Sequence, residues 1–145
     1  MEDKIYSEYC AILAEELQPA MGCTEPIAVA YCAALARKTL GCLPEDVQVY
    51  ASANIIKNVK SVVVPNTGGQ RGLTVAAAAG IVAGDADAKL QVLAGITPEQ
   101  VEEIAAYEKR GIVHVHPSDK DFIFDIQVRV SGGGHTAFAE IAGFH

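Results

Sequence analysis

The chain has 145 residues, of which half are hydrophobic and a fifth are charged, and its formal net charge is −7. This length suits a single domain over residues 1–145 with its own core. The acidic balance and the scattered Lys and Arg residues argue against binding to nucleic acid or to an anionic membrane. Neither a secretion signal pattern nor a membrane-spanning apolar run occurs, so we expect a cytoplasmic protein.

Two helices are predicted in the first third of the chain. Apolar residues recur at a spacing of four from Ile5 to Leu17, which predicts an amphipathic helix over about residues 3 to 18. Pro26 suits the first turn of a second helix, which we expect to run to Leu40. The abundance of alanine favours helices that pack closely through small residues.

The middle of the chain alternates between strand and helix signals. Residues 47 to 52 alternate apolar and polar, as in a half-buried strand. The run Val62–Val64 predicts a short buried strand or extended segment, although a buried helical turn fits its length as well. The alanine-rich residues 73 to 94 predict one or two helices, with Asp85 or Asp87 capping the second.

The last third of the chain begins with a helix and then predicts strands. Thr97–Gln100 combines an N-cap, a proline and a capping-box glutamine. Residues 112 to 116 and 122 to 130 alternate as strands, and Ser131–Gly134 is a turn to a further strand over 135 to 144. The fold class is therefore α+β, with helices packed on a mostly antiparallel sheet and a hairpin-rich last third.

The stretch from Ser52 to Gly72 is the richest in groups that could bind a ligand. Polar side chains surround the valine run, and polar groups beside a buried segment require partners, which a small zwitterion or carboxylate would supply. Lys57 and Lys60 could equally be a solvated rim. The predicted binding residues are Ser52, Asn54, Lys57, Asn58, Asn66, Thr67 and Gly68.

One of the four cysteines stands out. Cys23 lies at a predicted helix N-terminus, where the helix dipole favours the thiolate that ligates metal or attacks an electrophile. The alternative is a buried thiol in a tight loop. Cys10, Cys32 and Cys42 lie in or beside helical apolar patterns and fit the role of small hydrophobic residues. The spacings of all four cysteines match no CxxC-type zinc pattern.

Histidines offer weaker candidates for chemistry. His114 and His116 share one face of a predicted strand, as two metal ligands would, but a solvated strand face explains them as well. His135 follows a glycine turn and is either functional or simply polar. The sequence contains no Ser-His-Asp order, P-loop lysine motif or GxGxxG, so nucleotide binding has little support.

Several of these segments together resemble a known enzyme family. Gly22–Pro26, Ser52–Asn58, Val64–Gly68 and the alanine-rich Gly72–Gly84 look like the N-terminal part of the L-cysteine desulfidase family. That family is similar to the α chain of iron–sulfur-dependent L-serine dehydratases. The resemblance implies a lyase that releases sulfide from L-cysteine or water from L-serine, giving pyruvate and ammonia.

The resemblance also implies a cofactor, a [4Fe–4S] cluster in which Cys23 is a candidate ligand. An open iron would act as a Lewis acid on the leaving group, and the polar residues of the central stretch would hold the amino-acid carboxylate or surround the cluster. Lys57 and His135 are candidate catalytic residues, but the general base is not identified. The family's other cluster cysteines lie beyond this chain, so we expect the isolated chain to be an inactive N-terminal fragment.

Alternatives from other classes stay open. The chain could be a stand-alone module that binds or senses a small amino acid without catalysis, or a purely structural subunit domain. The sequence does not decide between cysteine and serine as substrate. Pairing of two copies through a sheet edge is a further expectation.

Overall fold

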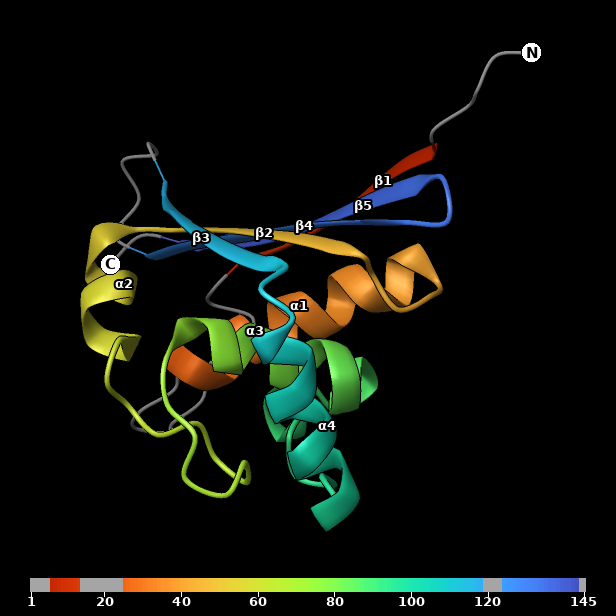
Figure 1. Ribbon diagram of the computed structural model, residues 1–145. Helices are drawn as coiled ribbons and strands as arrows, with labels where there is room; N and C mark the ends of the chain where they lie inside the picture. The colour runs from red at the N-terminus through yellow and green to blue at the C-terminus, as the bar shows by residue number, and fades with distance from the viewer. Residues whose placement is uncertain (1–5, 14–24, 119–123, 144–145) are drawn as a thin grey trace.

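The structure is a computed structural model that describes residues 6–13, 25–118 and 124–143 (Figure 1). No helix among these residues is long and apolar enough to cross a membrane. In chain order the elements are β1 (Tyr6–Leu13), α1 (Glu25–Leu40), β2 (Asp46–Ala51), α2 (Ala53–Val59), α3 (Leu73–Ala83), the 3₁₀ helix η2 (Ala86–Gln91), α4 (Pro98–Lys109), β3 (Val113–Pro117), β4 (Phe124–Gly132) and β5 (His135–Gly143).

The strands form one five-stranded sheet in the order β1-β5-β4-β2-β3. Its centre is antiparallel, because β4 pairs with β5 as a hairpin and with β2 on its other side. Each edge strand runs parallel to its neighbour, β1 to β5 and β3 to β2. A parallel pair needs a crossover, which α2, α3 and α4 supply between β2 and β3. The α+β class and the C-terminal hairpin are confirmed, and the sheet as a whole is mixed.

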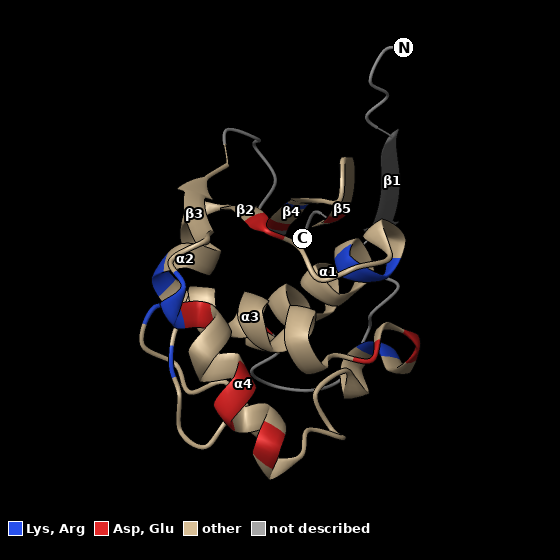
Figure 2. Cartoon of the chain, turned by 45° about the vertical axis from the view of Figure 1, so that its right-hand side comes forward, with Lys and Arg blue, Asp and Glu red and all other residues tan. Residues whose placement is uncertain are grey.

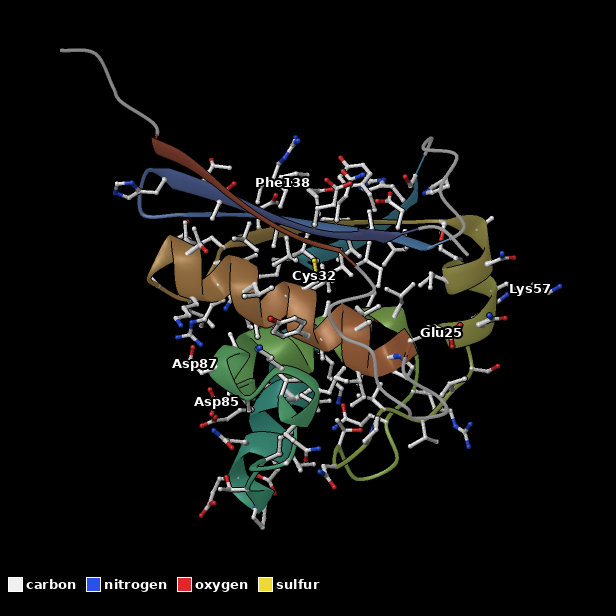
Figure 3. All side chains as sticks on the ribbon, turned by 180° about the vertical axis from the view of Figure 1, so that it is seen from behind. Glu25, Cys32, Lys57, Asp85, Asp87 and Phe138 are labelled. Atoms are coloured by element: carbon white, nitrogen blue, oxygen red, sulfur yellow. The ribbon has the colours of Figure 1, made fainter. Side chains whose placement is uncertain are left out.

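The core lies between one face of the sheet and the helices. Figure 1 shows α1, α3 and α4 on the same side of the sheet, and no described helix covers the other side. Alternate strand positions such as Val49, Val128 and Ala139 are fully buried. Cys32 on α1 fills the layer between helix and sheet, with its Sγ 3.3 Å from the carbonyl oxygen of Ala139 (Figure 3). Its predicted role as a small hydrophobic residue agrees with this place.

Helices α1 and α3 approach each other through small residues, as the alanine-rich composition predicts. Most of α3 is buried. At Gly80 a Cβ atom would lie 2.1 Å from the carbonyl oxygen of Ala30 on α1, so backbone meets backbone at this crossing. Only glycine permits this approach at that position.

Two helix starts follow the predicted capping chemistry. The Thr97 hydroxyl accepts a hydrogen bond from the Gln100 backbone N–H, and the Gln100 side chain accepts one from the Thr97 N–H. This is the reciprocal capping box that opens α4. Asp85 caps η2 by accepting from the Asp87 N–H at 3.0 Å.

The predicted N-terminal helix over residues 3 to 18 is wrong, because Tyr6–Leu13 form the edge strand β1. A spacing of four residues fits one face of a helix, but it is an even spacing and fits one face of a strand equally well. Backbone pairing with β5 decides between the two, and β5 lies far away in the sequence. Cys10 consequently belongs to a strand, and residues 14 to 18 lie outside the described residues.

Residues 53 to 59 form an element that the sequence analysis does not predict. Ala53–Val59 are the short helix α2, in which Ile55 and Val59, four residues apart, are buried. Val62–Val64 form neither a strand nor a helical turn, but an extended segment with one isolated bridge between Val63 and Arg71, which agrees with the extended-segment alternative. The chain reverses direction after this run, so the pairing does not extend beyond one bridge. Val63 is 40% exposed.

Candidate functional site

The polar residues of α2 form the exposed side of a short amphipathic helix. Ile55 and Val59 point into the core, whereas Asn54, Lys57 and Asn58 are exposed. Positions three and four apart share one face of a helix, so these three side chains, which we call the α2 face, are presented together. Figure 2 shows Lys and Arg residues on α2 and on the loop beside it, which makes this edge of the molecule locally basic.

The start of α1 lies against the α2 face. Asn58 Nδ2 donates a hydrogen bond to Glu25 Oε2 at 3.2 Å, which joins residues 33 positions apart. Glu25 is the first residue of α1, and Figure 3 shows it beside α2, while Lys57 extends outward from α2. A cation, a carboxylate and two amides are thus gathered on adjoining helices. These groups complement the carboxylate and ammonium of a zwitterion.

Asn66, Thr67 and Gly68 have partners within the fold. The Thr67 side chain is fully buried, and its hydroxyl donates to the carbonyl oxygen of Val64 at 2.7 Å. Asn66 Nδ2 donates to the carbonyl oxygen of Leu93 at 3.0 Å. Gly68 has a φ of 73°, which favours glycine, and a Cβ there would lie 3.1 Å from Val101 Cγ1. A role in folding the loop accounts for all three residues.

Ser52 connects β2 to α2, and it is also linked to β4. It is the N-cap of α2 and is 6% exposed. Its backbone N–H donates to the carbonyl oxygen of Asp125 at 2.9 Å. Ser52 therefore fixes where α2 begins relative to the sheet, and it places Asp125 next to the start of this helix.

Asp125 is a buried carboxyl that the sequence reasoning missed. It is fully buried, and its Oδ2 accepts from Ser118 Oγ at 2.6 Å and from Gln127 Nε2 at 3.0 Å. Burial raises the pKa of the Asp125 carboxyl, and the neighbouring Glu140 side chain raises it too, while the hydrogen bonds from Ser118 and Gln127 lower it. The alternation of polar and apolar residues along β4 predicts that Asp125 lies on the polar side of the strand. Nothing in that pattern predicts that the Asp125 side chain is buried.

The histidines lie away from the α2 face or have other partners. His135 begins β5 opposite Gly132, whereas Ala51, just before α2, pairs with Ile126. Six residues of β4 separate these positions, which is about 20 Å, so Lys57 and His135 are not brought together. His116 Nε2 lies 2.6 Å from Gln48 Oε1 and its ring stacks on Tyr50 at 4.8 Å.

The described residues do not form the ligand set that an iron–sulfur cluster needs. Cluster irons are held mainly by cysteine thiolates, but Cys32 is in the core and Cys42 is exposed on the surface. No group of three or more His, Cys, Asp or Glu side chains that could hold a metal ion occurs in the described part. Cys23, the predicted cluster ligand, lies outside the described residues, two positions before Glu25.

Comparison with known proteins identifies relatives that are much longer than this chain. A protein of Desulfitobacterium hafniense is 46% identical over 144 residues, which is 99% of this chain and 34% of that protein. A relative in Treponema denticola is 42% identical, and the match covers 97% of this chain and 32% of that protein. A relative in Fusobacterium nucleatum is also 42% identical, and the match covers 100% of this chain and 34% of that protein. All three are named UPF0597 proteins. The chain spans about a third of the length of these curated relatives.

These relatives correct one expectation from the sequence. The assignment to the L-cysteine desulfidase family, and to proteins like the serine dehydratase α chain, is wrong, because the matching proteins carry the name UPF0597, which states no activity. No family model matches the chain, and no solved structure matches it. Short motifs rich in glycine, asparagine and proline recur in loops for structural reasons, as Asn66 and Thr67 illustrate here.

Proposed function

We propose that the α2 face and Glu25 together bind a small α-amino acid such as L-cysteine or L-serine, in a cytoplasmic protein. The observation that carries this proposal is the 3.2 Å hydrogen bond between Asn58 and Glu25, which places a carboxylate beside a locally basic helix. The Lys57 ammonium would pair with the ligand carboxylate, and the Glu25 carboxylate with the ligand ammonium. The amide of Asn54 can both donate and accept, which suits a hydroxyl or thiol.

A second candidate function belongs to a longer protein that contains this chain. We propose that such a protein could eliminate sulfide or water from the bound amino acid to give pyruvate and ammonia, and that the isolated chain is inactive. The observation that favours it is the same hydrogen bond of Asn58 to Glu25, which gathers a carboxylate and a lysine where the amino acid would bind. The described residues do not fit a [4Fe–4S] cluster, so we derive no step through one. Lys57 stays a candidate catalytic residue, and self-association through the β1 or β3 edge stays a proposal.

Binding is tested by ligand-induced thermal stabilisation of the 145-residue chain. A ligand that binds only the folded state raises the unfolding midpoint as its concentration rises. We expect L-serine and L-cysteine to raise the midpoint, and two analogues to do so much less: serinol, which lacks the carboxylate, and 3-hydroxypropionate, which lacks the ammonium. Equal stabilisation by L-serine and serinol would exclude the proposed recognition of the zwitterion.

Variants separate the α2 face from general charge effects. Lys57→Ala and Asn58→Ala should each remove most of the stabilisation by L-serine, whereas Lys109→Ala, an exposed lysine at the end of α4, should not. Pyruvate formation is measured separately on a protein of the relatives' length. Absence of pyruvate with intact binding would reject the elimination and leave the binding site standing.

A further inference from the structure

A cavity lies at the opposite end of α1 from the α2 face. It has a volume of about 540 Å³ and is lined by residues of α1, α3, α4 and the loop before β2. Arg37 contributes from α1, twelve residues after Glu25, which is about 18 Å along the helix axis. Small-molecule sites in proteins commonly measure about 300 to 1,000 Å³. The cavity is therefore large enough for a small ligand and separate from the α2 face.

Each of the two guanidinium groups that line this cavity contacts a neighbouring group of the fold. Arg37 Nη1 donates to the carbonyl oxygen of Ile81 in the last turn of α3 at 2.6 Å. The Arg110 guanidinium carbon lies 5.3 Å from the centre of the Tyr107 ring. Tyr107 in turn is fixed by its hydroxyl, which donates to the carbonyl oxygen of Pro44 at 2.8 Å. The hydrogen-bonded guanidinium of Arg37 therefore loses less conformational entropy when a ligand binds.

The two arginines have positive charge without an acidic partner in the described part of the chain. The ion pair seen there joins Lys38 to Asp87 and involves neither arginine. An arginine has five N–H donors, so each guanidinium keeps donors for an acceptor with two oxygens. Two guanidinium groups therefore line one cavity in a chain whose net charge is −7.

The remaining walls of the cavity are mainly apolar. Leu43, Val82 and Ala106 line it, and the Leu43 side chain is 43% exposed, which is unusual for a leucine here. Glu103 also lines the cavity and offsets part of the positive charge. A ligand with one negative charge and an apolar body matches this combination better than a dianion does.

We propose that this cavity binds a small organic monocarboxylate, with its carboxylate on Arg37 and Arg110 and its apolar body against Leu43, Val82 and Ala106. Planar guanidinium groups match a carboxylate through paired hydrogen bonds. The proposal does not rest on the amino-acid site, because the two surfaces share no residue. Lys57→Ala should leave this binding unchanged.

The probe for the test is 4-phenylbutyrate, and its uncharged amide, 4-phenylbutyramide, is the matched control. Isothermal titration on the 145-residue chain should show saturable binding of the acid, and the amide should bind at least about tenfold more weakly. Arg110→Gln should weaken binding of the acid by at least about tenfold. Arg129→Gln is the control variant, because Arg129 also stacks on a ring, that of Phe138 at 5.4 Å, but does not line the cavity.

A second variant keeps the test decisive if Arg110→Gln alters folding. Leu43→Asp changes an exposed side chain, so it should fold normally, and its added negative charge should weaken binding of the acid. The proposal is overturned if the acid does not bind saturably, if acid and amide bind equally, or if Arg129→Gln weakens binding as much as Arg110→Gln does. It is also overturned if a folded Leu43→Asp variant binds the acid as the unaltered chain does.

Discussion

Gly80 on α3 lies so close to Ala30 on α1 that a Cβ atom at Gly80 would stand 2.1 Å from the Ala30 carbonyl oxygen. A side-chain rotation cannot relieve this clash, because the nearest atoms belong to the Ala30 backbone. Gly80→Ala should therefore force the helices apart and lower the free energy of unfolding by about 2 kcal/mol or more. Urea unfolding measures this change. Gly95→Ala is the control, since a Cβ atom at Gly95 would meet nothing within 4 Å. If Gly80→Ala lowered the free energy of unfolding no more than Gly95→Ala does, the close packing of α1 and α3 would be contradicted.

The buried carboxyl of Asp125 predicts a pH dependence of stability. Its pKa in the folded state is raised, chiefly by burial, so the folded chain holds this proton more tightly than the unfolded chain does. The contribution to stability is complete below the unfolded pKa of about 4 and is lost as pH rises through the folded value. We expect Asp125→Asn to gain stability relative to the unaltered chain as pH rises from about 4 to 7.

The control for that measurement is Asp46→Asn, which changes a carboxyl that is only partly buried. Urea unfolding at a series of pH values gives the difference in stability between each variant and the unaltered chain. For Asp125→Asn this difference should change with pH in the stated direction. If it is independent of pH, or if Asp46→Asn shows the same trend, the effect does not come from the buried carboxyl.

The Thr67 hydroxyl should matter for stability and not for binding. Thr67→Val removes the donor to the Val64 carbonyl oxygen and leaves a buried acceptor without it, which should cost about 1 to 2 kcal/mol. Thr67→Ser keeps the hydroxyl and should cost less. Guanidinium unfolding compares the two variants, and titration with L-serine should give the same affinity for both as for the unaltered chain. If Thr67→Val greatly weakened the binding of L-serine and Thr67→Ser did not, the Thr67 hydroxyl would take part in binding and the prediction would be wrong.

The elements that the sequence predicts correctly have local signals. The capping box of Thr97 and Gln100 needs only a four-residue pattern, and the alternation along β4 and β5 repeats over a long stretch with a glycine turn between. Strand β1 has no such signal of its own. Its spacing of four fits helix and strand alike, and only pairing with β5, a partner more than a hundred residues away, selects the strand.

The candidate site was predictable only in part, for a similar reason. The density of polar residues around Asn54, Lys57 and Asn58 is visible in the sequence, and the structure presents these side chains on one exposed face. Their contact with Glu25 depends on how α1 and α2 meet at the end of the sheet. The hydrogen bond that Asp125 accepts from Ser118 likewise depends on where the end of β3 lies relative to β4, whereas Gln127 is two residues along the same strand.

Amino-acid recognition by the α2 face is tested most directly by titrating the isotopically labelled chain with L-serine and following its backbone amide resonances. We expect the resonances of Glu25 and of Ala53–Val59 to move along one saturable curve, while those of Arg37 and Arg110 stay in place. Asn58→Ala should markedly lower the affinity for L-serine that this curve gives, because it removes the hydrogen bond from α2 to Glu25 on α1. Saturable shifts confined to other residues, or none in α2 at any concentration of L-serine, would contradict the proposed site.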